Sequence, residues 1–293
     1  MQRRSVLLTL ALTLLALPAM AQNPPPDRLQ RILAGGVLRV GTTMDTPVFS
    51  MRNPASGQIE GFDMDALATL GAALASEASG QRGDSMMRAP DTRPEPGSSA
   101  RSALGVRIEY VKMTFGTMLA DLAADKFDIA MSGMGRTLER ARVATFSKPY
   151  LRYGKLLMIR SSDRDRFKSL ADLDHPGIKI AYNKGGLNDR FANTMFKQAT
   201  PIGFASNELA TADLIAGKVD AQVSDSTAAL YMARQDSRLA AMSPDNVFNP
   251  VYVAILLRRE DQTLLNYVNI WIDQIEMDGT LAKIRSKWLG DTK

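Results

Sequence analysis

The sequence contains no cysteine and a single histidine, and each scarcity excludes a class of chemistry. Without cysteine, disulfide bonds, thiolate metal sites and cysteine nucleophiles are excluded. The histidine, His175, lies between Asp174 and Pro176 in a predicted turn, where an imidazole is far more often solvent-facing than catalytic. A Ser-His-Asp triad and a histidine metal site are therefore not expected, and we predict no bound metal ion and no cofactor.

The chain also lacks a strong excess of charge of either sign. It carries 36 basic and 31 acidic side chains, a formal net charge of +5. Removal of an N-terminal segment containing Arg3 and Arg4 would leave 34 basic side chains and a charge of +3. This balance is mild and evenly spread, so nucleic acid is not an expected partner. The 293 residues, 45% of them hydrophobic, are enough for two modest domains.

Long apolar runs are absent, apart from a short one near the start of the chain. Residues 1–21 combine a basic Gln2–Arg4, an apolar Val6–Leu17 and a small-x-small Ala19–Ala21, which together are typical of a secretory signal peptide. The apolar part is too short to span a bilayer, which disfavours the alternative of a membrane anchor. We expect cleavage after Ala21, a periplasmic mature protein and no stable membrane insertion.

The most informative stretch runs from Phe127 to Lys155. An apolar strand, Phe127–Ser132, leads through a glycine loop, Gly133–Thr137, into a helical turn that carries Arg140. Free backbone N–H groups at such a turn favour an anion, and an arginine can hold a carboxylate through two hydrogen bonds. The alternative is that Arg140 is a solvated helix arginine.

A second unit of the same kind follows, because the strand Lys179–Asn183 ends in a glycine loop and a helix start, residues 184–191. Between the first helices and strands, Glu77–Ala103 contains Gly, Pro, Ser, Arg and Asp without an apolar period. We predict that residues 77–103 are a flexible insertion, either a tolerated surface loop or an interaction segment.

The order of residues in FDIAMSGMGRTLERARVATFSKPY, residues 127–150, resembles the signature of the periplasmic amino-acid-binding proteins, the solute-binding proteins of ABC importers. The segment ILAGGVLRVGTT, residues 32–43, and the segment GFDMD resemble that family too. The resemblance implies an α/β, two-lobe periplasmic-binding-protein fold of type II. The chain would cross between the lobes twice, and a ligand would lie in the cleft at the hinge.

The implied organisation places residues 27–152 in the first lobe and residues 153–250 in the second, with residues 251–293 returning to the first. The ligand would be an amino acid or a related small carboxylate, and the partner would be an ABC permease. By this resemblance Arg140 holds the α-carboxylate, the loop from Ser132 to Thr137 assists, and Asp225 holds the α-amine. The expected ligand-binding residues are Asp45, Thr46, Phe115, Ser132, Gly133, Met134, Arg140, Gly186, Leu187, Asn188 and Asp225.

Two of these acids have a structural alternative. Asp225 precedes a helix that begins at Ser226, so its carboxylate would cap that helix. Asp45 follows the first strand and would be an ordinary turn residue. If both faced the cleft with Arg140, a zwitterion would be held by opposite charges, as desolvated charges require.

Within this superfamily the chain also resembles the periplasmic cyclohexadienyl dehydratases, which convert prephenate and arogenate to phenylpyruvate and phenylalanine. The parallels include FDIAMSG, PYLRYGK and NKGGLNDRFANTMFKQA. Their general acid is a glutamate, and Asp189 stands at its position, while Leu187 replaces a threonine and Thr46 a tyrosine. The resemblance leaves open an enzyme with Asp189 as general acid, against a binder in which Asp189 is a first-turn acid that favours the helix dipole.

Overall fold

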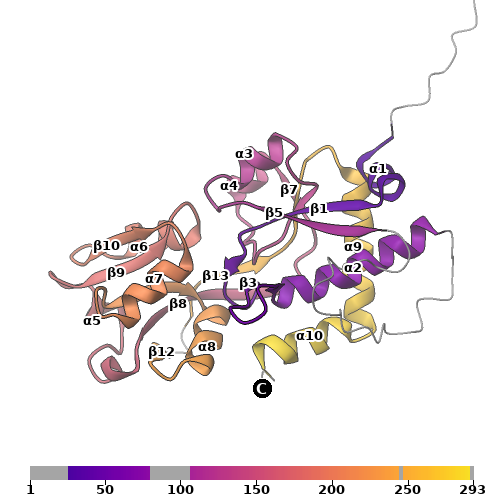
Figure 1. Cartoon of the computed structure of the whole chain (residues 1–293). Coiled ribbons are helices and arrows are strands. Elements are labelled where there is room, and N and C mark those ends of the chain that lie inside the picture. Colours follow the sequence, from indigo (N-terminus) through magenta and orange to yellow (C-terminus); the bar gives the residue numbers. More distant parts are fainter. Residues whose placement is uncertain (1–25, 80–105, 244–246, 291–293) are drawn as a thin grey trace, which may run out of the picture.

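The computed structural model describes residues 26–79, 106–243 and 247–290, which form two lobes, each built on its own mixed β-sheet (Figure 1). The predicted α/β class and two-lobe architecture are confirmed. A smaller antiparallel sheet of β2 (Asp45–Thr46), β3 (Ser50–Arg52) and β4 (Ile59–Glu60) extends the first lobe. Nothing in the described part of the chain has the length and apolar character of a membrane-spanning helix.

The first lobe is a five-stranded sheet covered by helices on both faces. Strand β1 pairs in parallel with β5 and β6, whereas β14 runs antiparallel beside β6 and β7. In sheet order the strands are β5 (Arg107–Lys112), β1 (Val37–Thr42), β6 (Ile129–Ala130), β14 (Leu256–Leu257) and β7 (Thr145–Phe146). The helices are α1 (Arg28–Gly35), α2 (Phe62–Ala78), α3 (Met118–Ala123), α4 (Leu138–Ala141), α9 (Gln262–Met277) and α10 (Thr280–Leu289).

The second lobe is a six-stranded sheet in which parallel and antiparallel pairs mix. In sheet order the strands are β10 (Thr200–Phe204), β9 (Lys179–Asn183), β11 (Ala221–Asp225), β8 (Leu151–Arg160) and β12 (Leu239–Ala241), with β13 (Phe248–Val253) also paired to β8. The helices are α5 (Leu170–Leu173), α6 (Leu187–Met195), α7 (Asn207–Ile215) and α8 (Ser226–Gln235), with a 3-10 turn at Ser161–Asp163.

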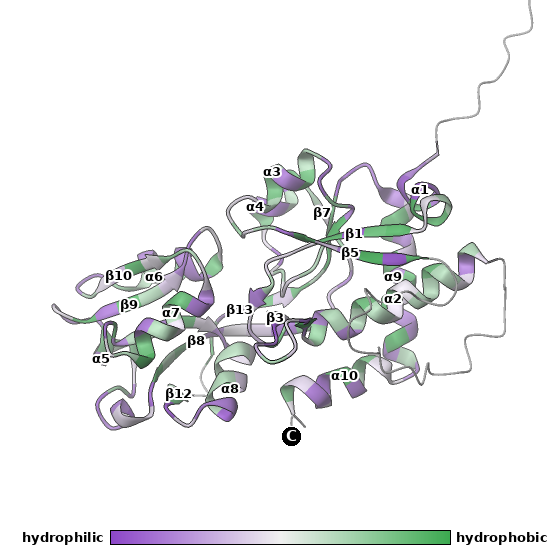
Figure 2. Cartoon of the chain, in the orientation of Figure 1, coloured by the Kyte–Doolittle hydropathy of each residue, from purple (hydrophilic) through white to green (hydrophobic). Residues whose placement is uncertain are grey.

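The core of the first lobe follows the apolar pattern of its strands and helices. Alternate residues of β1, Leu38 and Val40, are fully buried, and so is Leu67 on α2. Apolar residues at helical spacing on α9, such as Val268 and Ile272, join the same cluster. Figure 2 shows this as hydrophobic colouring along β1 and over much of α2. Burial of these side chains, rather than helix propensity, stabilises the elements that carry the site.

The second connection between the lobes runs through residues 251–257, which belong to two strands. Strand β13 pairs with β8 in the second lobe, and β14 pairs with β6 in the first. The backbone N–H of Ala254 donates to the carbonyl of Met134 (3.0 Å), which takes the chain out of one sheet before it enters the other. The two antiparallel strands β8 and β13 therefore form the hinge-side connection (Figure 1).

Two predicted boundaries shift. The strand predicted over Phe127–Ser132 is regular only at Ile129–Ala130, as β6. Helix α3 begins at Met118, after a hydroxyl-bonded turn between Thr114 and Thr117. Helix α2 continues to Ala78, so the start of the predicted insertion at Glu77 is helical. Residues 80–103 of that insertion, like the predicted signal peptide, lie outside the described residues.

Candidate functional site

The candidate site is a small pocket between the two lobes, which we call the interlobe pocket. The space between its side chains is about 20 Å³, close to the size of one water site, so the lobes are closed on each other. Its lining residues are Thr46, Pro47, Phe115, Gly135, Arg140, Tyr153, Lys155, Asn183, Leu187, Asn188, Asn207, Ser224, Asp225 and Ala228.

Arg140 reaches this pocket from the one-turn helix α4. Thr137 precedes the helix in extended conformation, and its hydroxyl accepts from the backbone N–H of Arg140 (3.2 Å), which fixes the turn. The Arg140 side chain is buried, and Nη1 donates to the carbonyl of Gly135 (2.9 Å). Burial lowers the pKa of Arg140, but an arginine remains a cation. The site therefore holds a buried cation without an acidic partner in the described network.

Lys155 and Asp225 form a buried ion pair on the second-lobe side of the pocket. They are cross-strand neighbours of the antiparallel pair β8 and β11, which brings together residues distant in the sequence. Lys155 Nζ also donates to Asn188 Oδ1 (2.6 Å), and Asn188 Nδ2 donates to Asn183 Oδ1 (2.8 Å). Burial lowers the pKa of Lys155, and the Asp225 carboxylate opposes that shift.

The capping interpretation of Asp225 is wrong. Asp225 does occupy the position before helix α8, but its side chain makes no capping hydrogen bond there. Its carboxylate accepts from Lys155 instead. Lys155 and Tyr153 are pocket residues that the sequence prediction missed. The available signal was a lysine that begins an otherwise apolar run, GKLLMI, of a central strand.

The glycine loop after β6 supports the pocket through Tyr153, one of the lining residues. Ser132 is fully buried, and its hydroxyl shares hydrogen bonds with those of Thr43 (2.9 Å) and Ser50 (2.7 Å). The Gly133 N–H donates to Asp63 Oδ2 (2.6 Å), and the Gly133 carbonyl accepts from the Tyr153 hydroxyl (3.0 Å). Neither residue lines the pocket, and the same holds for Met134, whose side chain packs in an apolar cluster.

Thr46, Phe115, Leu187 and Asn188 do line the pocket, as do Arg140 and Asp225, so the structure brings six predicted residues together. Asp45 is not among the lining residues. It lies in strand β2, where Oδ2 accepts from the backbone N–H of Asn207 (3.1 Å) at the start of helix α7 in the opposite lobe. Its contact therefore joins the lobes, and it is not simply a turn residue.

Asp189 also lies outside the pocket lining. In the first turn of α6 its Oδ2 accepts from the backbone N–H of Gly185 (2.8 Å), and its Oδ1 accepts from Asn193 Nδ2 (2.8 Å). Gly186, immediately before the helix, packs close to the Phe115 side chain from the first lobe. Both carboxylate oxygens of Asp189 are thus engaged by its own loop and helix, which accords with the first-turn interpretation.

Comparison with known proteins agrees with this architecture. Residues 97–291 match the family described as bacterial extracellular solute-binding proteins, family 3. The chain is 34% identical over 280 residues to cyclohexadienyl dehydratase of Pseudomonas aeruginosa. The match covers 95% of this chain and 92% of that protein. It is 26% identical over 301 residues to the L-arginine-binding protein of the same organism. That match covers 98% of this chain and 96% of the arginine-binding protein.

Solved structures of the same type are similar as well. The crystal structure of the ancestral amino acid-binding protein AncCDT-1, a precursor of cyclohexadienyl dehydratase, is 31% identical, with a TM-score of 0.71. The match covers 89% of this chain and 99% of the ancestral one. Together with the family match, this similarity accounts for the two-lobe fold of type II.

Proposed function

Because the chain belongs to family 3 of the bacterial extracellular solute-binding proteins, we propose that it binds an amino acid or a related small carboxylate between its lobes and delivers it to an ABC importer. The mature protein acts in the periplasm after cleavage following Ala21. The amino-acid-binding relatives support this proposal, since several of them are binding proteins of ABC transporters by name.

The observation that carries the proposal is the buried Arg140 cation in the interlobe pocket. The nearest acid of the pocket lining, Asp225, is already paired with Lys155. A desolvated cation is costly unless a counter-charge neutralises it, and a carboxylate matches the geometry of a guanidinium. The pocket is almost filled in the closed state, so the lobes open to admit the ligand and close around it.

The test is the Arg140→Ala variant in a thermal-shift screen of amino acids and small carboxylates. A ligand that binds only the folded state raises the melting temperature of the wild type, and Arg140→Ala should lose that rise. Arg142→Ala is the matched control, because Arg142 is an exposed arginine two residues further along the chain. An unchanged ligand response in Arg140→Ala would show that this pocket does not hold the carboxylate.

A second candidate function is a cyclohexadienyl-dehydratase-like lyase that acts on prephenate or arogenate. The 34% identity over 95% of the chain to a dehydratase favours it. Asp189 would be its general acid, and it would first have to leave the hydrogen bonds with Gly185 and Asn193.

Incubation of the purified protein with prephenate, and separately with arogenate, separates the two functions. Formation of the aromatic product, followed by absorbance and lost in Asp189→Asn, would make the chain an enzyme. Absence of turnover by a folded protein would rule out this second candidate, and the binding function would remain. In a binder, Asp189→Asn should keep most of the ligand affinity.

A further inference from the structure

The charges that line the interlobe pocket do not match an amino acid zwitterion. Three lining side chains are charged, Arg140, Lys155 and Asp225, which gives the pocket a net charge of +1. The fourth ionisable side chain, Tyr153, is neutral, because burial raises its pKa well above 10.0. A zwitterion brings no net charge and leaves this excess uncompensated, whereas a ligand of charge −1 cancels it.

The position of Lys155 accounts for the mismatch. Its ammonium is bound to the Asp225 carboxylate and to Asn188 Oδ1. The β8–β11 ladder fixes the backbone of both partners, and the Lys155 side chain is only 4% exposed. The Asp225 carboxylate is therefore already neutralised by an ammonium that comes from the protein itself.

We propose that the pocket selects carboxylates that lack an α-ammonium group, such as 2-oxo or 2-hydroxy acids, with Lys155 as the residue that determines this preference. This inference rests on the proposed binding function and specifies its ligand class. Arg140 holds the ligand carboxylate, and Lys155 and Asn188 face the carbon that would carry the amino group.

An α-ammonium would be disfavoured for two physical reasons. It would be a third cation beside Arg140 and Lys155 in a desolvated space, where like charges repel strongly. It would also have to share acceptors with Lys155, because Asp225 Oδ1 and Asn188 Oδ1 already accept from that ammonium. A 2-oxo group carries no such donors and accepts hydrogen bonds, so it suits the neighbourhood of an ammonium.

The experiment measures affinities for matched pairs of acids by calorimetry, with phenylpyruvate against phenylalanine, 2-oxoglutarate against glutamate, and pyruvate against alanine. For the wild type we expect the 2-oxo acid of the best-binding pair to bind at least about tenfold more tightly than its amino acid. In Lys155→Met the ratio should move toward the amino acid by about tenfold or more, because a ligand ammonium can then pair with the vacated Asp225. Lys197→Met, at an exposed lysine outside the pocket, is the control and should leave the ratio unchanged.

Each outcome is decisive. Wild-type protein that binds an amino acid as tightly as its 2-oxo partner overturns the inference and leaves the binding function intact. A lack of response to both classes removes the proposed function and the inference with it. The wild-type comparison needs no variant, so a poorly folded Lys155→Met would not prevent the test.

Discussion

Asp63 is a fully buried carboxyl group that connects three parts of the first lobe. It lies in the first turn of α2, and its oxygens accept from the Gly133 N–H (2.6 Å) and the Tyr150 hydroxyl (2.8 Å). Its bonds reach the glycine loop and Tyr150, and not the start of its own helix. The glycine loop that precedes Arg140 therefore depends on the Asp63 side chain.

The first prediction concerns the pH dependence of stability through Asp63. Burial raises its pKa from 3.8 to about 7, against the lowering effect of the two hydrogen bonds. The folded state thus holds a proton that the unfolded state has lost, and the stabilisation present below pH 3.8 disappears as the pH rises through 7. Relative to Asp63→Asn, the wild type should lose up to about 1.4 kcal/mol of unfolding free energy per pH unit in this window.

Chemical denaturation of the wild type and of Asp63→Asn at several pH values between 4 and 7 checks this prediction, with those limits set by the two pKa values. Parallel stability profiles would show that Asp63 has the same pKa folded and unfolded. The asparagine is close in shape and keeps an acceptor for Gly133, so the comparison isolates the proton.

At the residue scale, the order of residues in the motif was enough to predict Arg140 as a pocket residue. It did not predict Lys155. A loop, a helix turn and an arginine are close along the chain, so their local geometry follows from neighbouring residues. Lys155 meets Asp225 only through the pairing of β8 with β11, which depends on the tertiary register. Asp189 differs from Lys155, since its carboxylate accepts from the backbone N–H of Gly185, only four residues earlier in the chain.

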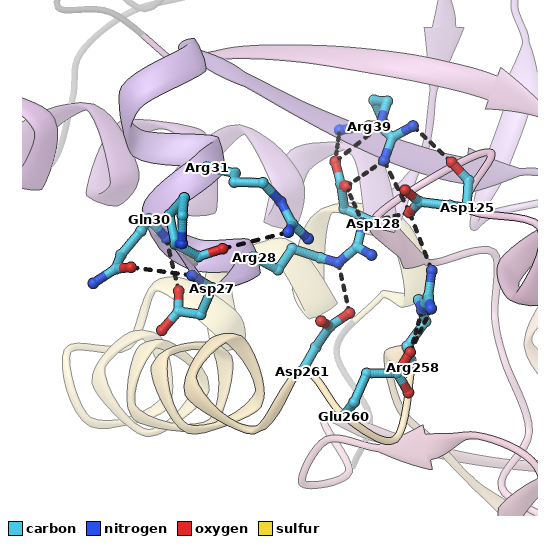
Figure 3. A network of polar contacts seen from close by, with 11 residues as sticks. Asp27, Arg28, Gln30, Arg31, Arg39, Asp125, Asp128, Arg258, Glu260 and Asp261 are labelled. Carbon is cyan, nitrogen blue, oxygen red and sulfur yellow. Dashed lines mark hydrogen bonds and ion pairs between the residues drawn. The ribbon is translucent and has the colours of Figure 1, made fainter. Parts of the chain in front are cut away.

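Among the elements, helix α1 is attached to the sheet by a partly buried cluster of charges around Arg28, which we call the Arg28 cluster (Figure 3). The Arg28 side chain, 4% exposed, forms ion pairs with Asp125 (2.7 Å), Asp128 (2.6 Å) and Asp261 (2.6 Å). These acids precede β6 and helix α9, so the cluster joins the start of the chain to the segment that returns to the first lobe.

The second prediction is that Arg28→Met lowers the unfolding free energy by about 3 kcal/mol, because it leaves the buried Asp261 carboxylate without its ion-pair partner. Arg39 still pairs with Asp128, which places the loss at the lower end of the usual range. Arg31→Met, at an exposed arginine of the same helix, should change stability by less than about 0.5 kcal/mol. Equal stability of the two variants, measured by denaturation, would contradict a stabilising Arg28 cluster.

The elements themselves were largely predictable, because their apolar periods and end signals are local. Asp27 caps α1 in a capping box, and Asp278 and Gly279 separate α9 from α10. The break between β13 and β14 was not predictable from the apolar run alone. It depends on the hydrogen bond from the Ala254 N–H to the carbonyl of Met134, which lies in a loop distant in the sequence.

At the scale of the whole molecule, side-chain contacts join the two lobes. Glu139 forms an ion pair with Arg190 across the cleft, and Asp45 accepts from Asn207. The surface pair is exposed and adds little, so close backbone packing at the glycine loops sets how far the lobes close. A Cβ atom at Gly185 would lie 2.7 Å from the backbone of Gly116 in the opposite lobe.

The last prediction is that Gly185→Ala holds the lobes apart and weakens ligand binding at least about tenfold, or about 1.4 kcal/mol. Two effects must be separated, since Gly185 has a φ of +84°, where an alanine costs about 1 kcal/mol without any clash. Gly177→Ala is the matched control, because Gly177 has a φ of +89° and no neighbouring atom within 4 Å of the added Cβ. Small-angle scattering with saturating ligand should show a closed form of Gly177→Ala and an open form of Gly185→Ala. If both variants close, the contact between Gly185 and Gly116 does not limit closure of the lobes.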